Sequence, residues 1–527
     1  MTAVRPGREL SRRSFFRLGG AVGAALALGP TLSACAGPTG AAGPGTMTLA
    51  LNRSLVSLDN KLNQFDAAVT VQRAVRQGLT RIGPDLSPEL VLAESFELTG
   101  DTRWTVRLRD GVRYSDGSPV TVDDVRTALE MYQQVQGSFL AGFFPEWPTV
   151  GTVDDRTFTL DTQRPFPVLD YLMANILITP AATNEAAELQ DGIGSGPYVV
   201  SSSNRGTGDY TLQRNQAYWG PAPVVDEVRV RFIPEESSRV VSMRSGEVDV
   251  IDTISPDSAD QLAGLPGVLV ESVPGTRTNQ LFYNFRKPAD HPLANPAVRE
   301  ALTYAIDQRA LTEDVLVGSV QSATGVVAGT LAGATSDHAY THDPRRARQM
   351  LEANGVLSGD LELTIIWETG EFASDTQVME AVTQMLADVG VRTKLNQFQP
   401  GGDISAWRQG KGGDWDVLGN GYGNPTGLAL TSLQGMYGGT AEKELTRDTY
   451  QGYVVPGVEQ LITAAGTEVD PARRDDLLAR AQDAAWDTWP CLWAFVPNAV
   501  LARRERVQDL ELSPSNSYVL AATELRG

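Results

Sequence analysis

The chain has 527 residues, of which 42% are hydrophobic, 7% aromatic and 20% charged. This is the composition of a globular protein, and the length allows about two to four domains, each able to bury a core. A disordered chain, a fibre and a single small module are therefore excluded. The net charge is −20, and because residues 1–34 carry five Arg and one Glu, the rest carries −24. Such an acidic body repels phosphate backbones and argues against nucleic acid as a ligand.

The N-terminus has the order of an export signal. Ser11–Arg17 contains paired arginines, and the apolar run Leu18–Leu28 that follows is too short to span a bilayer comfortably. The paired Arg followed by Phe resembles a twin-arginine signal. Leu32–Cys35 resembles a bacterial lipobox, whose Cys becomes the acylated first residue of the mature protein. We predict a signal peptide over residues 1–34 and a lipid anchor at Cys35, on the periplasmic or extracellular side of the cell membrane.

Residues 35–45 continue with small residues, Pro and Thr, so we expect a flexible tether before a body that starts near Met47. No later segment is long and apolar enough for a transmembrane helix. Apart from the Cys in the lipobox, the chain has one cysteine, Cys491, which excludes an internal disulfide. Its apolar neighbours predict a buried core residue, with a nucleophile as the weaker alternative.

The first strong pattern in the body is a hairpin followed by a helix. Residues 94–98 and 103–109 read as strands, and the second alternates strictly. Thr121 can cap a helix, with Asp124 three residues further on. Three apolar side chains of the second strand should share one face: Trp104, Val106 and Leu108.

The region from 196 to 252 mixes strand and helix patterns. A helix pattern at Ser237–Ser245 stands between strand patterns at Val228–Ile233 and Val248–Ile251. Alternation of this kind is typical of α/β organisation.

The second half of the chain repeats this alternation, starting from a strand at Leu281–Phe285. Asn295 should cap a helix opened by Pro296, and Asp343-Pro344 repeats this device in a helix that stops at Asn354-Gly355. Three later segments form a strand, helix and strand unit with parallel strands and a right-handed crossover: Leu361–Trp367, Ser374–Val389 and Val391–Phe398.

Leu108–Val125 resembles the signature stretch of the extracellular solute-binding proteins of peptide and nickel ABC transporters, solute-binding family 5. The resemblance spans roughly residues 47 to 520. Four further segments fit the family in the same order: Gly194–Tyr198, Asn215–Gly220, Val298–Asp307 and Tyr340–Leu351.

The resemblance implies an α/β fold with two lobes, a type II periplasmic-binding-protein-like architecture with an extra subdomain. A hinge joins the lobes, and the ligand is enclosed between them. The chain would cross between lobes near Gln280–Phe285 and Trp489–Phe495. The implied parts are lobe I at 46–279 plus 490–527, with the extra subdomain at 80–189, and lobe II at 280–489.

In peptide-binding relatives, an Asp after the second-lobe strands pairs with the α-amino group of the ligand. The corresponding stretch here is Asp416–Pro425, in which Tyr422 and Pro425 match. Gly421 stands where that Asp would be, and Asn424 replaces a second acid. An amide cannot supply the charge-assisted bond that an ammonium favours. Recognition of a peptide N-terminus would then need one of three other acids: Glu368, Asp414 or Asp416.

The glycine-rich run Gly401–Gly427 contains Trp407, Trp415 and Tyr422, and aromatic faces among glycines suit a ligand with apolar or planar surface. The alternative is that these aromatic side chains cover the core beneath a long loop. The predicted ligand-binding residues are Trp367, Glu368, Trp407, Trp415, Asn420, Tyr422, Asn424 and Trp493.

Catalytic and metal motifs are missing from the sequence. It contains no Gly-x-Ser-x-Gly elbow, Ser-x-x-Lys pair or phosphate-binding loop, so we predict no catalytic residue. His338 and His342 are four residues apart, but Asp343-Pro344 starts a helix directly after them, which places the pair in a loop. We predict neither a metal nor a cofactor.

The first functional hypothesis is therefore a monomeric, lipid-anchored substrate-binding component of an ABC importer. It captures an oligopeptide-like solute and delivers it to the permease and ATPase complex, without enzymatic chemistry. A non-peptide solute, such as a nickel chelate, an opine, a sugar or a siderophore-like molecule, is the main alternative. An exported cell-envelope hydrolase and a nutrient sensor without transport are two others.

Overall fold

The fold is given by a computed structural model. It describes residues 45–53, 58, 61, 66–135, 140–183, 192–204, 206–399, 402–439, 451–515 and 517–526. All of them belong to one compact unit, Ala41–Gly527. The predicted signal peptide, the lipid anchor at Cys35 and the tether up to residue 44 lie outside the described residues. Within these ranges, no helix has the length and apolar character needed to cross a membrane.

The described residues form a sheet of twelve strands that runs through the body. Ten strands follow the order β16-β15-β17-β13-β18-β11-β1-β10-β9-β8, and β12 and β14 both pair with β18. The strands on one side of the central β18 are β1 (Thr46–Leu51), β8 (Tyr198–Asn204), β9 (Asp209–Arg214), β10 (Glu227–Phe232), β11 (Val250–Asp252) and β12 (Val268–Pro274). Those on the other side are β13 (Thr278–Tyr283), β14 (Val320–Ser322), β15 (Glu362–Glu368), β16 (Arg392–Phe398) and β17 (Val417–Tyr422).

The first half of this sheet confirms the α/β organisation expected from residues 196–252. β1 pairs in parallel with both β10 and β11, and α4 (Glu236–Ser245) connects β10 to β11. Two more helices pack on this half, α1 (Asp66–Val75) and α5 (Pro256–Ala263).

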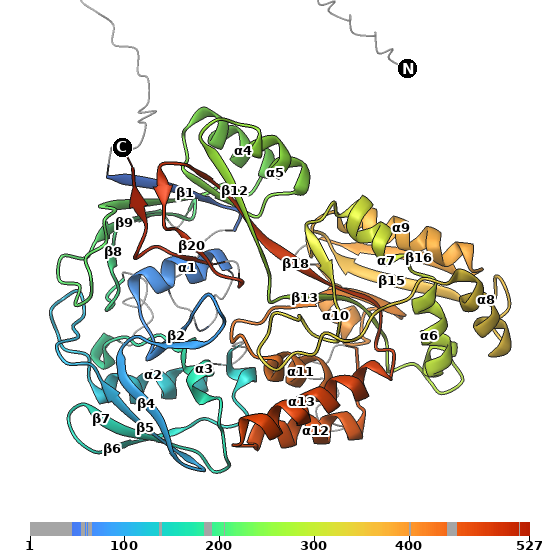
Figure 1. Ribbon diagram of the computed structural model, residues 1–527, viewed down its shortest axis with the longest axis horizontal. Coiled ribbons are helices and arrows are strands. Elements are labelled where there is room, and N and C mark those ends of the chain that lie inside the picture. Colours follow the sequence, from blue (N-terminus) through green and yellow to red (C-terminus); the bar gives the residue numbers. More distant parts are fainter. Residues whose placement is uncertain are drawn as a thin grey trace, which may run out of the picture. The chain divides into compact units, whose positions relative to one another are not determined.

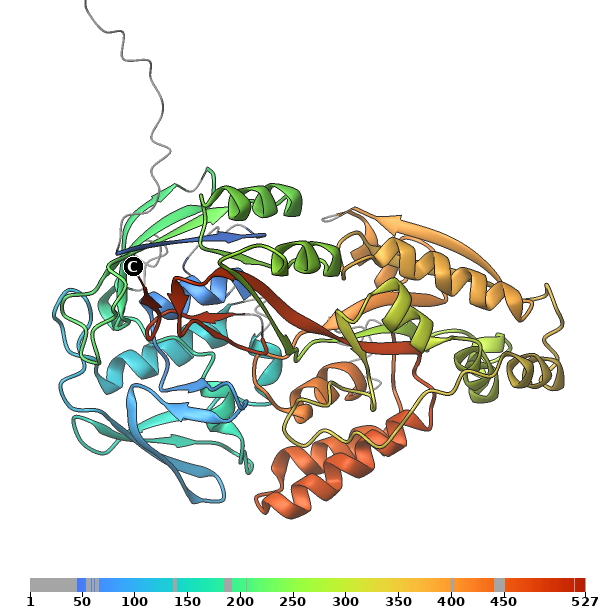
Figure 2. The ribbon, with the colours of Figure 1, turned by 45° about the horizontal axis from the view of Figure 1, so that its top comes forward.

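The second half of the sheet contains the expected parallel crossover. β15 pairs in parallel with β16, and α9 (Asp375–Asp388) connects them. In Figure 2, α9 lies along one face of these strands. The side chains of Val378, Val382 and Leu386 are buried on one face of α9, and Met385 is partly buried beside them.

One strand belongs to both halves. β18 (Cys491–Arg504) pairs with β13 through its first residues, up to Phe495, and with β12 through Asn498–Arg504. Figure 1 shows it in red, running from β13 towards β12. The chain therefore passes between the two halves of the sheet at residues 275–277 and near Pro497. The lobe crossings near Gln280–Phe285 and Trp489–Phe495 and the lobe boundaries stay predictions.

A separate four-stranded sheet confirms the predicted hairpin. Its order is β4-β5-β7-β6, and the side chains of Trp104, Val106 and Leu108 are buried on one face of β5. Thr121 and Asp124 form a reciprocal capping box at the start of α2. The elements are β4 (Ala93–Gly100), β5 (Arg103–Leu108), β6 (Thr149–Thr152), β7 (Thr157–Asp161) and α2 (Val122–Gln134).

Helix caps in the second half also follow the sequence. The Asn295 side chain accepts the Ala297 N–H at 3.0 Å at the start of α6 (Pro296–Tyr304). Asp343 does the same for the Arg346 N–H at the start of α8 (Pro344–Ala353).

The remaining elements are α3 (Leu169–Met173), α7 (Gln308–Ala310), α10 (Ile404–Arg408), α11 (Ala429–Tyr437), α12 (Pro456–Thr467), α13 (Pro471–Trp486), β2 (Thr80–Ile82), β3 (Pro88–Leu90), β19 (Val507–Gln508), β20 (Glu511–Leu512), β21 (Tyr518–Val519), β22 (Glu524–Leu525) and the short turns η1 (Leu140–Phe143), η2 (Ala181–Thr183), η4 (Pro292–Ala294) and η5 (Leu311–Val315).

The run Gly401–Gly427 is not one long loop. The run contains the helix α10 and the strand β17, which pairs with β13 and β15 inside the sheet. Glycine hides the strand pattern because it has no side chain to alternate. At Gly419 a Cβ would come within 2.5 Å of the end of the Met379 side chain and 3.2 Å of the Trp367 Cβ, so a larger residue there would require Met379 to move.

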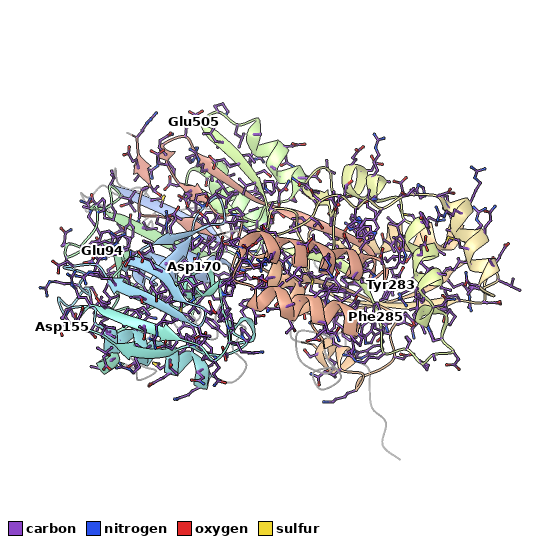
Figure 3. All side chains as sticks on the ribbon, turned by 60° about the horizontal axis from the view of Figure 1, so that its bottom comes forward. Glu94, Asp155, Asp170, Tyr283, Phe285 and Glu505 are labelled. Atoms are coloured by element: carbon purple, nitrogen blue, oxygen red, sulfur yellow. The ribbon has the colours of Figure 1, made fainter. Side chains whose placement is uncertain are left out.

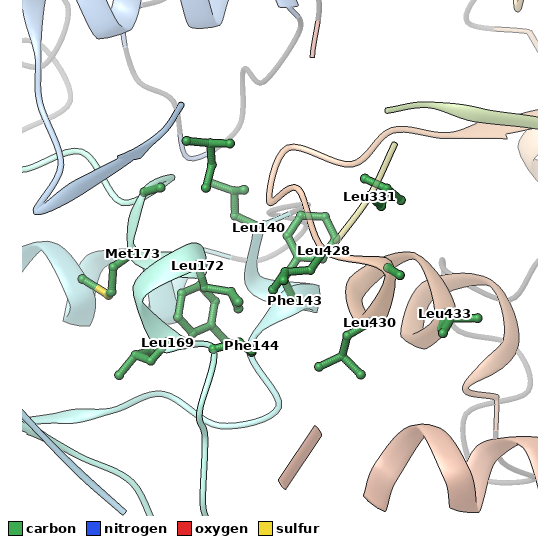
Figure 4. Close-up of a cluster of buried hydrophobic side chains, with 14 of the residues drawn as sticks. Leu140, Phe143, Phe144, Leu169, Leu172, Met173, Leu331, Leu428, Leu430 and Leu433 are labelled. Atoms are coloured by element: carbon green, nitrogen blue, oxygen red, sulfur yellow. The ribbon is translucent and has the colours of Figure 1, made fainter. Parts of the chain in front are cut away.

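A single hydrophobic cluster joins segments that are far apart in the sequence. Leu140 and Phe143 of η1 share it with Leu428, Leu430 and Leu433 at α11 (Figure 4). The segment expected as an extra subdomain therefore shares a core with the helices of the second half. A hydrogen bond of 3.3 Å from Asn175 Nδ2 to the Pro425 carbonyl joins the same two segments.

Cys491 confirms the prediction of a buried core thiol, and it gives a test of native packing. Its Sγ lies 3.2 Å from Tyr340 Oη, and burial raises the pKa of the thiol to about 12. Very little thiolate then exists at pH 8. In a chain that starts at Ala36, Cys491 is the sole thiol. We expect no reaction with a disulfide reagent in native buffer and complete reaction in guanidinium, with Cys491→Ser as the blank. Rapid labelling of the native protein would contradict the burial.

Asp170 in α3 should make stability depend on pH. Burial raises the pKa of its carboxyl from 3.8 to about 6, although the Tyr171 N–H and Arg474 both favour the charged form. Because the folded state holds this proton more tightly, the contribution of Asp170 stabilises the fold below about pH 4. That contribution is lost as the pH rises through 6.

The variant Asp170→Asn keeps a neutral side chain at every pH. Its free energy of unfolding, measured against wild type by urea titration, should rise by about 2–3 kcal/mol between pH 4 and pH 7.5. Asp155→Asn is the matched control, because Asp155 is exposed in a bend (Figure 3). The difference for this control should not change with pH. A pH-independent difference for Asp170→Asn would show that the carboxyl is not held protonated.

Candidate functional site

The carboxyl ends of three parallel strands meet at one edge of the second half of the sheet. Glu368 of β15 lies beside Phe398 of β16, and β15 is also parallel to β17. β13 is antiparallel to β17, which places Thr278 opposite Tyr422. Open α/β sheets bind ligands outside the carboxyl ends of their strands. We call this region, residues 277–280, 368–371 and 420–424, the carboxyl edge.

A charged cluster lies at the centre of the carboxyl edge. Arg277 pairs with Glu371 through Nη2 and Oε1, and the same carboxylate oxygen accepts the Gly421 N–H at 2.8 Å. The Nε of Arg277 donates to Asn279 Oδ1 at 3.0 Å. The Glu371 side chain is 13% exposed, whereas the Arg277 side chain is 41% exposed. The edge thus presents a half-exposed guanidinium whose carboxylate partner is mostly covered.

Asn279 carries an unused hydrogen-bond donor at this cluster. Its side chain is fully buried, and its Nδ2 has no hydrogen-bond partner among the described residues. The Arg277 Nε–H needs an acceptor, so a flip of the Asn279 amide, which would exchange Oδ1 and Nδ2, is excluded. A buried donor without an acceptor costs about 1–3 kcal/mol, and an acceptor from outside the chain would satisfy it.

Gly421 cannot carry a side chain in this arrangement. A Cβ at this position would overlap Asn279 Oδ1 and Arg277 Nε. The space that an acidic side chain would need is therefore filled by Arg277 and Asn279. A carboxylate is still present, because Glu371 reaches the main chain of Gly421 from the loop after β15.

Two of the predicted site residues, Tyr422 and Asn420, lie on the carboxyl edge, and each contacts a side chain from another element. The ring of Tyr422 meets the ring of Phe143 edge-on, with centroids 6.4 Å apart. Asn420 accepts a hydrogen bond of 3.4 Å from Arg408 Nη2. Both side chains are partly exposed. A second guanidinium therefore lies on this edge, next to the charged cluster.

Glu368 and Trp407 are also partly exposed and lie at or beside the edge. Glu368 is the last residue of β15. Trp407 in α10 packs its ring against Phe398, with centroids 5.4 Å apart, and covers the main chain of Gly412 and Gly413. The structure therefore brings four of the eight predicted residues to this region.

The other three tryptophans lie in the core. Trp415, Trp493 and Trp367 are 1%, 0% and 2% exposed. Trp415 donates to the Trp407 carbonyl at 2.9 Å, and Trp493 stacks on Phe495 with centroids 4.4 Å apart. This placement corrects the expectation that they face a ligand, because aromatic side chains fill a core as readily as they line a site. We carry none of the three into the binding site.

Asn424 organises the loop after β17. Its Oδ1 accepts the N–H groups of Thr426 and Gly427, both at 3.0 Å, and its Nδ2 donates to the Leu428 carbonyl and to Ser432 Oγ. The side chain is 2% exposed. All of these bonds stay within the chain, so the structure supports a structural role for this residue.

Two of the acids considered as substitutes lie at the wrong end of β17. Asp416 precedes the strand, is buried, and pairs with Lys287 Nζ at 2.8 Å. Asp414 pairs with the same ammonium from the surface. Six residues of strand separate Asp416 from Tyr422, a distance of about 20 Å. Glu368 is the one candidate that lies at the carboxyl edge.

The histidine pair lies in a loop, as expected, and the two rings are held separately. His338 hydrogen-bonds to Asp483 at 2.9 Å and stacks on Trp486, whereas His342 lies 3.3 Å from Asp307. His342 and Asp307 also line a pocket of about 610 Å³ beside η5. None of the predicted site residues lines this pocket, so we place the candidate site at the carboxyl edge, where donors and charges converge.

Sequence reasoning missed Arg277, Asn279 and Glu371. No motif marks them, since Arg277 and Asn279 lie around the start of a strand and Glu371 lies in a loop almost a hundred residues later. The signal available in the sequence was Gly421. It stands where relatives have an acid, so another residue must supply a charge at this site.

The fold is the two-lobed α/β fold of periplasmic binding proteins. A family model described as "Bacterial extracellular solute-binding proteins, family 5 Middle" matches residues 87–444. The chain belongs to this family, which confirms the resemblance seen in the sequence.

Three similar proteins illustrate the relationship. The glutathione-binding protein GsiB of Escherichia coli K12 is 25% identical over 482 residues, covering 88% of this chain and 92% of GsiB. The substrate-binding protein CtaP of Listeria monocytogenes has a TM-score of 0.81 at 20% identity, covering 91% and 99% of the two chains. DppA of Helicobacter pylori, solved with the peptide STSA, has a TM-score of 0.76 at 20% identity, covering 92% and 98%.

Proposed function

We propose that this protein is the lipid-anchored receptor of an ABC importer and that it captures a small peptide-like solute at the carboxyl edge. The observation that carries the proposal is the charged cluster around Gly421, where a half-exposed guanidinium lies beside a buried amide donor with no partner in the described chain. These donors suit a polar solute whose oxygens, like those of a peptide main chain, accept hydrogen bonds from them in place of water. The names of GsiB and DppA, which refer to glutathione and a peptide, support this solute class.

The mechanism is reversible enclosure. A solute held at the carboxyl edge would contact the second lobe directly, and Tyr422 links this edge to the 80–189 segment through its contact with the buried ring of Phe143. Contacts to both parts stabilise the closed state, which a permease can then recognise. No step requires a covalent intermediate, so the protein acts as a binding component and not as an enzyme.

A non-peptide solute is the second candidate, and Gly421 favours it. The position lacks the carboxylate side chain that would pair with an ammonium, and Arg277 fills its place. A solute without a free amine would fit this arrangement equally well. The choice between the two candidates depends on binding measurements with defined solutes.

The experiment is thermal unfolding of a chain starting at Ala36, with glutathione, with a pool of di- to pentapeptides, and without solute. A solute at 100 times its Kd should stabilise the native state by about 2.7 kcal/mol. A higher Tm with either solute supports peptide-like capture. An unchanged Tm with both, in protein shown by mass spectrometry to carry no co-purified solute, would reject this class and favour the non-peptide candidate.

The lipid anchor is tested separately. Replacing Cys35 by Ala in the full chain should abolish incorporation of a labelled fatty acid and release the protein from the membrane fraction. A variant with Cys491→Ser is the control, because that thiol is buried in the core. Continued membrane attachment of the Cys35 variant would contradict the anchor.

A further inference from the structure

We infer that Arg277 is a specificity-determining residue, and that it receives a carboxylate of the solute where an ammonium would otherwise bind. This inference rests on the proposed function, since it names the chemical class that the carboxyl edge accepts: small peptide-like anions whose recognition does not depend on a free amine.

Two hydrogen-bond donors at the cluster are available to a solute. Glu371 Oε1 already accepts bonds from Arg277 and from the Gly421 N–H, and Asn279 Oδ1 accepts from Arg277. The two donors are the Asn279 Nδ2, buried and without a partner in the described chain, and the outer face of the half-exposed guanidinium. The second carboxylate oxygen of Glu371, Oε2, is an acceptor on the less exposed side of the pair. Donors of this kind are satisfied by a carboxylate and are repelled by an ammonium.

The space around the guanidinium fits this role. Nη1 of Arg277 lies 3.8 Å from the position that a Cβ of Gly423 would occupy, with no other heavy atom within 4 Å of that position. Two glycines, 421 and 423, thus leave the backbone bare beside the cation. A planar carboxylate can approach it there, and a guanidinium binds such a group with two parallel hydrogen bonds.

The charges nearby are balanced. Arg277 and Arg408 supply two guanidinium groups, and Glu371 and Glu368 supply two carboxylates. Within the central pair, the Arg277 side chain is 41% exposed and the Glu371 side chain 13%. The charge of this pair that a solute meets first is therefore the cation.

The first test compares two variants of the ion pair, one without its negative charge and one without either charge. Glu371→Gln keeps the cation, whereas Arg277→Gln/Glu371→Gln removes both charges and leaves no buried acid without its partner. In isothermal titration with the peptide pool, the first variant should bind more tightly than wild type, because it removes a negative charge beside the cation. The double variant should lose about 10- to 100-fold, the value of a charge-assisted bond. Loss of binding in Glu371→Gln and retention in the double variant would overturn the inference.

The second test changes the solute. N-acetylation of the pool should leave its affinity nearly unchanged, and C-terminal amidation should weaken it about 10- to 100-fold. The reverse order would show that an ammonium is recognised and would overturn the inference. If neither pool binds the wild type, the peptide-like function fails, and the third test decides the inference by itself.

The third test needs no peptide. In protein labelled with ¹⁵N-arginine, the Nε–H resonance of Arg277 is assigned by its loss in Arg277→Lys. Acetate should shift this resonance in a saturable way, beyond the effect of sodium chloride at the same ionic strength. Methylammonium chloride should not shift it. A response to acetate no larger than the salt effect, or a response to methylammonium alone, would overturn the inference whatever the natural solute is.

Discussion

Replacing Arg239 by Ala should lower the free energy of unfolding by about 3–5 kcal/mol, the cost of leaving a buried charge without its partner. Arg239 on α4 and Asp252 at the end of β11 are 3% and 4% exposed, and their charged groups lie 3.6 Å apart. The guanidinium also donates to the carbonyls of Ile233 and Pro234 at 2.8 Å and of Thr253 at 2.9 Å. One side chain therefore holds the carboxyl ends of β10 and β11 together.

The measurement is urea unfolding at pH 7, followed by tryptophan fluorescence. Arg244→Ala is the matched control, because Arg244 lies on the same helix with an exposed side chain. Its effect should stay below about 0.5 kcal/mol. A companion variant, Arg239→Lys, keeps the charge but cannot serve three carbonyls in one plane, so it should recover only part of the loss. Equal stability of Arg239→Ala and Arg244→Ala would refute the buried pair as a stabilising contact.

Replacing Asn424 by Ala should destabilise the protein by about 3 kcal/mol, since the substitution leaves several buried polar groups without partners. The amide accepts from two backbone N–H groups and donates to the Leu428 carbonyl and Ser432 Oγ inside a region with almost no solvent access. Asn424→Asp should be at least as harmful, because an oxygen would then face the Leu428 carbonyl.

Asn420→Ala is the control for this experiment. Asn420 lies four residues earlier, is partly exposed and has one long contact, to Arg408. Its loss should cost less than about 1 kcal/mol. The pair of variants separates two roles for Asn424, structural and ligand-binding. An unchanged Tm for Asn424→Ala together with weaker solute binding would show that the second role holds.

Local sequence patterns predicted much of the fold, for a physical reason. The capping box of Thr121 and Asp124 and the caps at Asn295 and Asp343 depend on side chains that reach main-chain groups only a few residues away. The crossover between β15 and β16 follows from the spacing of apolar residues within one segment. Interactions of such short range can be predicted from a few neighbouring residues.

The strand β17 and the charged cluster could not be predicted in this way. Gly419 and Gly421 remove the alternation that marks a strand, and side chains from distant segments, Met379 and Arg277, lie close to the backbone at these two positions. Arg277 and Glu371 are 94 residues apart and meet only through the pairing of β13, β17 and β15. Burial of the three tryptophans likewise depends on packing that no local pattern encodes.

The position of β18 in the sheet also determines when the protein can fold. This strand lies between β13 and β11, and its pairing partners come from both halves, yet it follows 490 other residues in the chain. During synthesis, each half of the sheet lacks its central strand until residues 491–504 have left the ribosome. Pairings over such sequence distances form slowly, because the entropy of closing long loops must be overcome first. Neither half of the sheet can therefore be completed before β18 is synthesised. We expect the last step of folding to be the pairing of β18 with strands of both halves.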